Sequence, residues 1–261
     1  MKFCSLASGS SGNCQYIEYK NTKIIIDAGL SGKKIEENLE KIGIKASDID
    51  AIFVTHEHID HIKSVGVLSR RHNLKVFSNK MTLDGMLPIV KKLDAKNTFI
   101  FENGKSFTFK DLEIMPVSTF HDCANGCGFV ISGDKKVSLL TDTGWVNQDA
   151  MEKMDGSELY YLESNHDVDM LMNGTYPYAT KQRILSAKGH LSNENAAEVL
   201  SMILKKKKEK ILLGHLSSDN NLPEVALQTI TNILTSEHKE ENVDYTIDVA
   251  PRFLPSKVFE L

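Results

Sequence analysis

The sequence has few of the features that mark secreted and membrane proteins. Only four of its 261 residues are cysteines, too few for a disulfide scaffold at this length, and their spacing matches no zinc module. Apolar runs such as residues 24–26 and 211–213 are far shorter than a bilayer-spanning helix requires. The first five residues begin no long apolar stretch of a secretory signal. We therefore expect a cytoplasmic protein with reduced thiols and no membrane segment.

The chain also lacks an excess of positive charge. Lys and Arg number 31 against 35 Asp and Glu, which gives a net charge of −4. Nucleic-acid-binding modules are commonly basic, so this balance counts mildly against a polyanionic partner. Bound divalent cations would reverse that argument, because they would concentrate positive charge in one cleft.

No low-complexity segment, long Pro/Gly/Ser stretch or repeat of fixed period interrupts the chain. Its hydrophobic and charged contents, 41% and 25%, are those of an ordinary globular protein. The length suits one large α/β domain, or two small ones. Of these we expect the single domain, over residues 1–261.

Apolar, β-rich segments bounded by glycine or polar residues predict a series of strands. They cover residues 14–19, 23–27, 51–55, 74–77, 113–117, 127–132, 137–141, 159–163 and 210–213. Helical patterns alternate with them over residues 33–42, 59–71, 193–204 and 223–236, and Ser31 and Ser192 are suited to cap the first and third of these helices. Strands with interspersed helices indicate a layered α/β architecture.

Six predicted strands run into, or are shortly followed by, an acidic residue or a histidine. These residues are Asp27, His56, His121, Asp142, Glu163 and His215. Parallel neighbours place their carboxyl ends along one edge of a sheet, where ligands usually bind. We therefore expect the six side chains to meet in one site at the edge of a sheet.

The densest group of metal ligands is the segment T-H-E-H-I-D-H at residues 55–61. It lies at the end of a predicted strand and the start of a predicted helix. The i, i+2 spacing of His56 and His58 in an extended turn lets both imidazoles reach one ion, while Asp60 and His61 point toward a second position. Nitrogen and oxygen ligands without thiolate suit Zn, Mn or Fe(II).

This H-x-H-x-D-H motif resembles the signature of the metallo-β-lactamase fold, an α/β protein built as a four-layer αββα sandwich. The later strand-end residues follow in the same order as in that family, over nearly the whole chain. The resemblance implies that Asp27 orients ligand imidazoles rather than binding metal itself. It also implies two ligand sets, one of His56, His58, His121 and Asp142, and one of Asp60, His61, His215 and the bridging Asp142.

Three later segments narrow the resemblance to the phosphodiesterase branch of the superfamily. Glu163 follows a strand, His190 stands in K-G-H-L-S, and His215 and Ser217 stand in G-H-L-S-S-D-N-N. With the L-A-S-G-S-S-G-N segment at residues 6–13, they resemble the YycJ (WalJ) family, small metallo-β-lactamase-fold proteins with 5′→3′ DNA exonuclease activity. The chain is too short for the β-CASP insertion of longer nuclease relatives.

The resemblance implies a dinuclear metal-dependent phosphodiesterase, most specifically a 5′→3′ exonuclease that acts on DNA ends. Two divalent ions (Zn, Mn or Fe) roughly 3.5–4 Å apart would activate a bridging hydroxide as the nucleophile. His190, paired with Glu163, is the candidate acid for the leaving 3′ oxygen. Asp60 and Asp27 complete the set of residues expected to serve catalysis.

Candidates for substrate binding are less specific. Ser217, Asn220 and Asn221 follow a ligand strand and carry groups that hydrogen-bond phosphate, and Ser10 lies in a Gly/Ser segment with backbone N–H groups suited to an anion. His166 follows another strand end. Ordinary turns use the same residue types, so a purely structural role stays open for each.

Two other functions remain compatible with the sequence. One is hydrolysis of RNA or of small cyclic phosphodiesters, which the mildly acidic charge keeps open. The other is a metal-binding regulatory module without catalysis. The residues do not indicate an oligomeric state.

Overall fold

The computed structural model describes residues 1–261 and contains fourteen strands and nine α-helices. One sheet is formed by β1 (Lys2–Ala7), β2 (Cys14–Tyr19), β3 (Thr22–Ile26), β4 (Ala51–Phe53), β5 (Lys75–Asn79), β6 (Thr98–Phe101) and β14 (Phe259–Glu260). The other is formed by β7 (Phe107–Phe109), β8 (Leu112–Ser118), β9 (Cys127–Ser132), β10 (Lys136–Leu140), β11 (Leu159–Glu163), β12 (Glu209–Gly214) and β13 (Tyr245–Val249).

The helices connect these strands. They are α1 (Gly32–Lys41), α2 (Ile59–Ile62), α3 (Val65–His72), α4 (Lys80–Val90), α5 (Gln148–Met154), α6 (Val168–Asn173), α7 (Tyr178–Leu185), α8 (Asn193–Ile203) and α9 (Pro223–Ser236), with short 3-10 turns η1 (Ala46–Asp48) and η2 (Ala95–Asn97). None of them combines the length and the apolar composition that crossing a bilayer requires.

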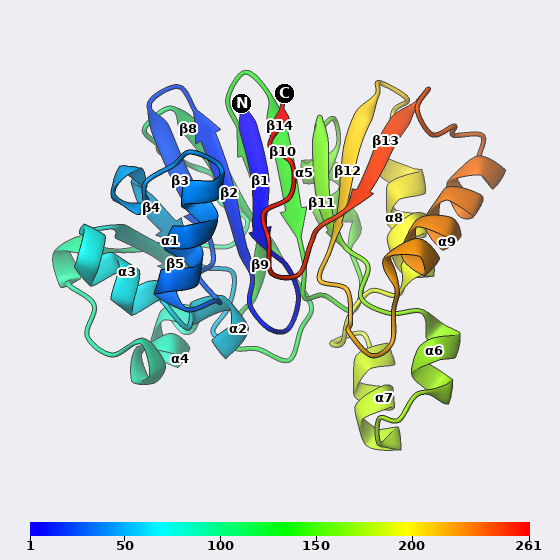
Figure 1. Cartoon of the computed structure of the whole chain (residues 1–261), viewed down its shortest axis with the longest axis horizontal. Coiled ribbons are helices and arrows are strands. Elements are labelled where there is room, and N and C mark those ends of the chain that lie inside the picture. Colours follow the sequence, from blue (N-terminus) through cyan, green and yellow to red (C-terminus); the bar gives the residue numbers. More distant parts are fainter.

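The two sheets stack with helices on both outer faces, which confirms the predicted αββα sandwich (Figure 1). Their strand orders are β14-β1-β2-β3-β4-β5-β6 and β13-β12-β11-β10-β9-β8-β7. In the first sheet β3 to β6 are parallel neighbours, and in the second β10 to β13 are. Each sheet therefore presents several carboxyl strand ends at one edge.

Side chains alternate between two buried layers along the central strands. In β3, Ile24 and Ile26 lie in the core between the sheets, whereas Ile25 packs toward the outer helices. In β12, Leu212 lies in the core between the sheets, and Leu213 packs outward. Because both faces of these strands are covered, their sequences are continuously apolar rather than alternating.

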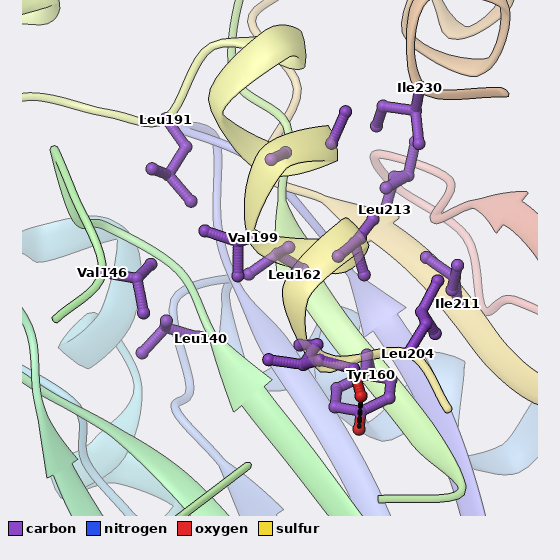
Figure 2. Close-up of a cluster of buried hydrophobic side chains, with 14 of the residues drawn as sticks. Leu140, Val146, Tyr160, Leu162, Leu191, Val199, Leu204, Ile211, Leu213 and Ile230 are labelled. Atoms are coloured by element: carbon purple, nitrogen blue, oxygen red, sulfur yellow. Dashed lines mark hydrogen bonds between the residues drawn. The ribbon is translucent and has the colours of Figure 1, made fainter. Parts of the chain in front are cut away.

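Helices α8 and α9 pack against the outer face of the second sheet. Figure 2 shows Leu162 of β11 beside Val199 of α8, with Ile230 of α9 completing the cluster. The hydroxyl of Tyr160 donates a hydrogen bond to the carbonyl of Ile203, 3.5 Å away, at the end of α8. This packing anchors α8 and therefore the segment that precedes it in the chain.

The structure contains every predicted strand, with ends shifted by no more than two residues. The predicted helices α1, α8 and α9 are also present, and the side chains of Ser31 and Ser192 cap α1 and α8. Elements that the sequence did not predict include β1, β6, β7, β13, β14 and α4 to α7. Several of these have too few residues to give a periodic signal.

The prediction of one continuous helix over residues 59–71 is wrong. The chain forms two helices there, α2 and α3, separated at Ser64. The backbone N–H of Ser64 donates to Ala28 O at 2.8 Å, and its hydroxyl donates to Leu30 O at 2.6 Å. These contacts with the loop after β3 replace helical hydrogen bonds, so Asp60 and His61 lie in the short helix α2.

Candidate metal centre

The strand-end residues meet between the edges of both sheets. Asp27 and His56 follow β3 and β4 of the first sheet, whereas Asp142, Glu163 and His215 follow or end β10, β11 and β12 of the second. The prediction that they lie along the edge of one sheet is therefore wrong. The two stacked sheets bring their carboxyl strand ends together, and the site takes residues from each.

Three of these residues have a backbone conformation that L-amino acids rarely adopt. The φ angles are 61° at Asp27, 56° at Asp142 and 56° at His215. A positive φ is unfavourable for residues other than glycine, and residues that adopt it are concentrated at functional sites. Here each turns the chain sharply where its strand ends.

The seven predicted metal ligands form overlapping groups in which the candidate ligand atoms lie within 4.8 Å of one another. The groups are His56, His58 and His121; His56, His61 and Asp142; and Asp60, His61 and His215. A fourth group contains Asp142, Glu163, His190 and His215. The structure thus brings together all seven residues that the sequence singled out.

Asp142 lies at the middle of the centre. Its Oδ2 is 3.3 Å from His61 Nε2, and its Oδ1 is 3.5 Å from His215 Nε2 and 3.9 Å from His121 Nε2. The carboxylate thus contacts imidazoles of both predicted ligand sets. This placement suits a bridging ligand.

The donor atoms of the centre fit a divalent metal ion. His56 Nε2, His215 Nε2 and Asp142 Oδ2 are buried and have no hydrogen-bond partner in the protein. Leaving such a group unsatisfied costs about 1–3 kcal/mol, which a bound cation would remove. Imidazole nitrogen and carboxylate oxygen, without thiolate, are ligands that Zn and similar divalent ions accept.

Four imidazoles are held through Nδ1, which leaves Nε2 directed at the centre. His61 Nδ1 is 2.7 Å from Asp27 Oδ2, and His215 Nδ1 is 2.9 Å from Glu163 Oε1. The Nδ1 atoms of His121 and His56 lie 3.0 Å from Gly189 O and from Thr55 Oγ1, respectively. Such outer contacts fix the tautomer and ring orientation of metal-binding histidines.

Thr55 is a functional residue that sequence reasoning missed. Its backbone N–H and its hydroxyl each donate to the Asp27 carboxylate at 2.8 Å. Since that hydroxyl hydrogen is used, His56 Nδ1 donates to Thr55 Oγ1. Asp27 belongs to no group of candidate metal ligands and instead contacts Thr55 and His61. The available signal for Thr55 was its position directly before His56, the first residue of the H-x-H-x-D-H motif.

Glu163 accepts hydrogen bonds from two histidines. Its Oε1 accepts hydrogen bonds from His190 Nδ1 at 2.7 Å and from His215 Nδ1 at 2.9 Å. Its Oε2 accepts from the backbone N–H groups of Thr143 and Leu191. The sequence predicted the pairing with His190 but not the contact with His215.

Electrostatics keep the carboxylates of Asp142 and Glu163 ionised. Burial favours the neutral acid, but the imidazoles of His215 and His61 hold the pKa of Asp142 well below its usual range. Burial opposes ionisation of Glu163 in the same way, and His190 and His215 nevertheless lower its pKa to about 2. Both groups therefore offer negative charge to a cation.

A polar cavity of about 270 Å³ opens beside the centre. Its lining residues are Ser10, Asn165, Tyr176, Thr180, Arg183, Ile184, His190, His215 and Ser217. Arg183 of α7 forms an ion pair with Asp122, the neighbour of His121. Arg183 was missed by sequence reasoning, although a basic residue is a usual contact for a phosphate backbone.

The residues predicted to bind substrate fall into two groups. Ser10 and Ser217 line this cavity, but the structure does not bring His166, Asn220 or Asn221 to it. Asn221 is buried and its amide donates to Ser164 O at 3.0 Å, while His166 and Asn220 are each 1% exposed.

Sequence comparisons agree with the geometry. The family model of the Beta-lactamase superfamily domain matches residues 22–215 of this chain. The chain is 42% identical over 254 residues to the exodeoxyribonuclease WalJ of Streptococcus pneumoniae, covering 96% of this chain and 94% of the relative. It is 36% identical over 259 residues to the exodeoxyribonuclease YycJ of Bacillus anthracis, covering 99% and 98%.

Solved structures show the same fold at low identity. The metallo-β-lactamase fold protein YhfI from Bacillus subtilis superposes with a TM-score of 0.74 at 16% identity, covering 100% of both chains. The short form of human tRNase Z superposes with a TM-score of 0.66 at 16% identity, covering 98% of this chain and 99% of that one.

Proposed function

The chain belongs to the metallo-β-lactamase superfamily and, within it, to the family of the exodeoxyribonucleases WalJ and YycJ, and from this premise we propose that it hydrolyses DNA from the 5′ end as a metal-dependent exonuclease. The observation that carries the proposal is the 42% identity to an exodeoxyribonuclease across 96% of the chain. The cluster of histidines and aspartates at the sheet edges supports the hydrolytic chemistry.

We assign the ligands to two divalent ions, Zn, Mn or Fe. One set is His56, His58, His121 and Asp142; the other is Asp60, His61, His215 and the shared Asp142. Asp27, Thr55 and Glu163 hold the imidazoles in place through their Nδ1 atoms. At such a centre, divalent ions supply activation of water and neutralisation of charge on the phosphoryl group.

His190 is the proton donor in this proposal. Its Nδ1 donates to Glu163, and the ring lines the cavity beside His215. Because Glu163 holds the ring through Nδ1, Nε2 is the nitrogen that would pass a proton to the leaving 3′ oxygen. That oxygen is a poor leaving group as an alkoxide, so protonation lowers the barrier to cleavage.

The DNA strand would approach the metal centre across the polar cavity. Ser10 and Ser217 line it with hydroxyl groups, and Arg183 adds a cation at its wall. These groups suit the oxygens of a phosphate backbone. Because the chain's net charge is −4, the bound ions rather than the surface would supply the main attraction for DNA.

The test is a digestion panel with the metal-loaded protein. The substrates are 5′-phosphorylated duplex DNA, single-stranded DNA, RNA of the same sequence and a small cyclic phosphodiester, each assayed with Mn or Zn and with a chelator. We expect metal-dependent release of mononucleotides from the 5′ end of DNA, and none from the Asp142→Ala variant.

Activity confined to RNA or to the small diester would replace DNA as the substrate. Absence of turnover on all four substrates by a protein that holds its metal would favour a regulatory module instead.

A further inference from the structure

A second cavity lies next to the metal centre and contains none of the metal ligands. Its volume is about 500 Å³, within the range of about 300–1,000 Å³ typical of small-molecule sites. The walls come from the loop after β12, the start of α9 and the segment after β13. Its lining includes Ser8, Leu216, Ser217, Ser218, Val249 and Arg252.

This cavity adjoins the metal centre directly. Ser217 lines both this cavity and the polar cavity beside His190. Ser8 lies in its wall and accepts a hydrogen bond at 2.7 Å from the backbone N–H of His215, a predicted ligand. A molecule in this cavity would therefore contact Ser8, which itself accepts a hydrogen bond from the proposed ligand His215.

The cation of the cavity has no anionic partner. Arg252 forms no ion pair, and the hydrogen bond that its guanidinium makes is from Nη2 to Leu216 O at 2.6 Å. The nearby carboxylate of Asp219 instead accepts hydrogen bonds from Tyr176 and Ser218, both at 2.9 Å. Arginine has five N–H donors in a planar fork, so most of them remain free for a phosphate.

The early glycine-rich segment makes room for this guanidinium. Gly9 has a φ of 120°, and a Cβ there would come within 2.8 Å of Arg252 Nη1. Any other residue at position 9 would be strained and would displace the side chain of Arg252. The S-G-S-S-G segment thus supports the cation of this cavity as well as placing Ser10 beside the centre.

We propose that this cavity binds the terminal nucleotide of the strand, with its 5′-phosphate on Arg252 and its sugar and base against Leu216 and Val249. The inference rests on the proposed function, since the 3′-phosphate of the same nucleotide would then be the scissile one at the centre. A cavity that holds one nucleotide accounts for cleavage at an end and for release of a nucleoside 5′-monophosphate.

The first experiment measures binding. Calorimetry with the full-length protein compares thymidine 3′,5′-bisphosphate with thymidine 3′-monophosphate. Both ligands present the same 3′-phosphate to the centre, so the ratio of their dissociation constants isolates the 5′-phosphate. We expect the bisphosphate to bind at least tenfold more tightly, and Arg252→Met to bring the ratio close to one.

Arg71→Met is the matched control, because Arg71 lies in α3, pairs with Glu36 and lines neither cavity. It should keep the ratio of the unaltered protein. An equal ratio in Arg252→Met and Arg71→Met would overturn the proposal. So would a bisphosphate that binds no more tightly than the monophosphate to the unaltered protein.

The second experiment separates this subsite from the exonuclease activity. We expect Arg252→Met to lower kcat/KM at least tenfold on 5′-phosphorylated DNA but much less on 5′-hydroxyl DNA, whereas a purely structural role would lower both equally. An equal loss on both substrates overturns the subsite and leaves the exonuclease intact. Selective binding of the bisphosphate without DNA cleavage supports the subsite while the exonuclease proposal fails.

Discussion

At the scale of single residues, Glu163 connects the proposed acid to the metal ligands. One of its oxygens contacts both His190 and His215, and the other is held by two backbone N–H groups. The carboxylate is 0% exposed, so its charge is compensated by these contacts and not by water. A change at Glu163 would therefore disturb ligand orientation and proton donation together, whereas a change at His190 separates the two.

His190→Ala should lower turnover about 10²–10⁴-fold, the usual contribution of a general acid. Metal content should stay near that of the unaltered protein, because the seven proposed ligands are unchanged. Elemental analysis and single-turnover cleavage of 5′-labelled DNA check both points, with His72→Ala on α3 as the surface control. Unchanged turnover would remove His190 from the mechanism, and loss of metal would make it a ligand.

His166 gives the protein a sensitivity to acid that is independent of catalysis. Both ring nitrogens are buried without a hydrogen-bond partner, and burial lowers its pKa from 6.5 to about 4. The unfolded chain therefore takes up a proton between these values while the folded chain does not. The resulting stabilisation is complete above pH 6.5 and is lost as the pH falls toward 4.

We expect this residue to account for about 2 kcal/mol of the loss in unfolding free energy between pH 7 and pH 4.5. Urea unfolding of the chelated protein at both pH values measures it. In His166→Gln the loss over this interval should be smaller by that amount. Identical pH dependence in the two proteins would show that His166 titrates normally in the folded state.

At the scale of elements, the loop after β3 positions the helix that carries Asp60 and His61. Gly29 of this loop packs so closely on α2 that a Cβ would lie 1.6 Å from Asp60 O. The same carbonyl accepts a hydrogen bond from the backbone N–H of Asn13. The loop, α2 and the glycine-rich segment thus form one packed unit behind the centre.

Gly29→Ala should displace α2 and weaken metal binding at least tenfold, because Asp60 and His61 move with it. Titration of the chelated protein with Zn or Mn measures the affinity. Gly32→Ala is the matched control, since a Cβ at Gly32 meets nothing closer than 3.6 Å and should leave the affinity unchanged. A folded Gly29→Ala protein with full affinity would contradict this role for the loop.

At the scale of the whole molecule, the centre joins the two sheets. The predicted ligands come from segments after β4 of the first sheet and after β8, β10 and β12 of the second. The core between the sheets is apolar and lies away from this edge. Metal bound here would therefore link the two halves of the sandwich and resist their separation.

Removing the metal should lower the thermal midpoint by roughly 5–10 °C. A ligand present at 100 times its Kd stabilises the folded state by about 2.7 kcal/mol, and each kcal/mol shifts Tm by about 2–4 °C in a chain of this size. Calorimetry with chelator and after metal addition measures the shift. Asp142→Ala should show little difference between the two conditions, and a metal-independent Tm in the unaltered protein would argue against a structural link.

Sequence alone was sufficient wherever a feature is local or periodic. The continuous apolar runs predicted β3, β11 and β12 because strands buried on both faces need no polar positions, and Ser31 and Ser192 marked the helix starts that they cap. The H-x-H-x-D-H spacing and the acids at strand ends predicted which side chains would gather. Short elements such as α6 and β7 left no signal of this kind.

Contacts between segments that are far apart in the sequence could be determined only from the tertiary structure. The sharing of Glu163 by His190 and His215, the contact of Thr55 with Asp27, the break at Ser64 and the cavity at Arg252 all arise where the two sheets and their loops pack together. Hydrogen-bond partners are set to within an ångström by that packing. The residue types indicate which chemistry is available, but the stacking of the sheets determines which groups come within reach.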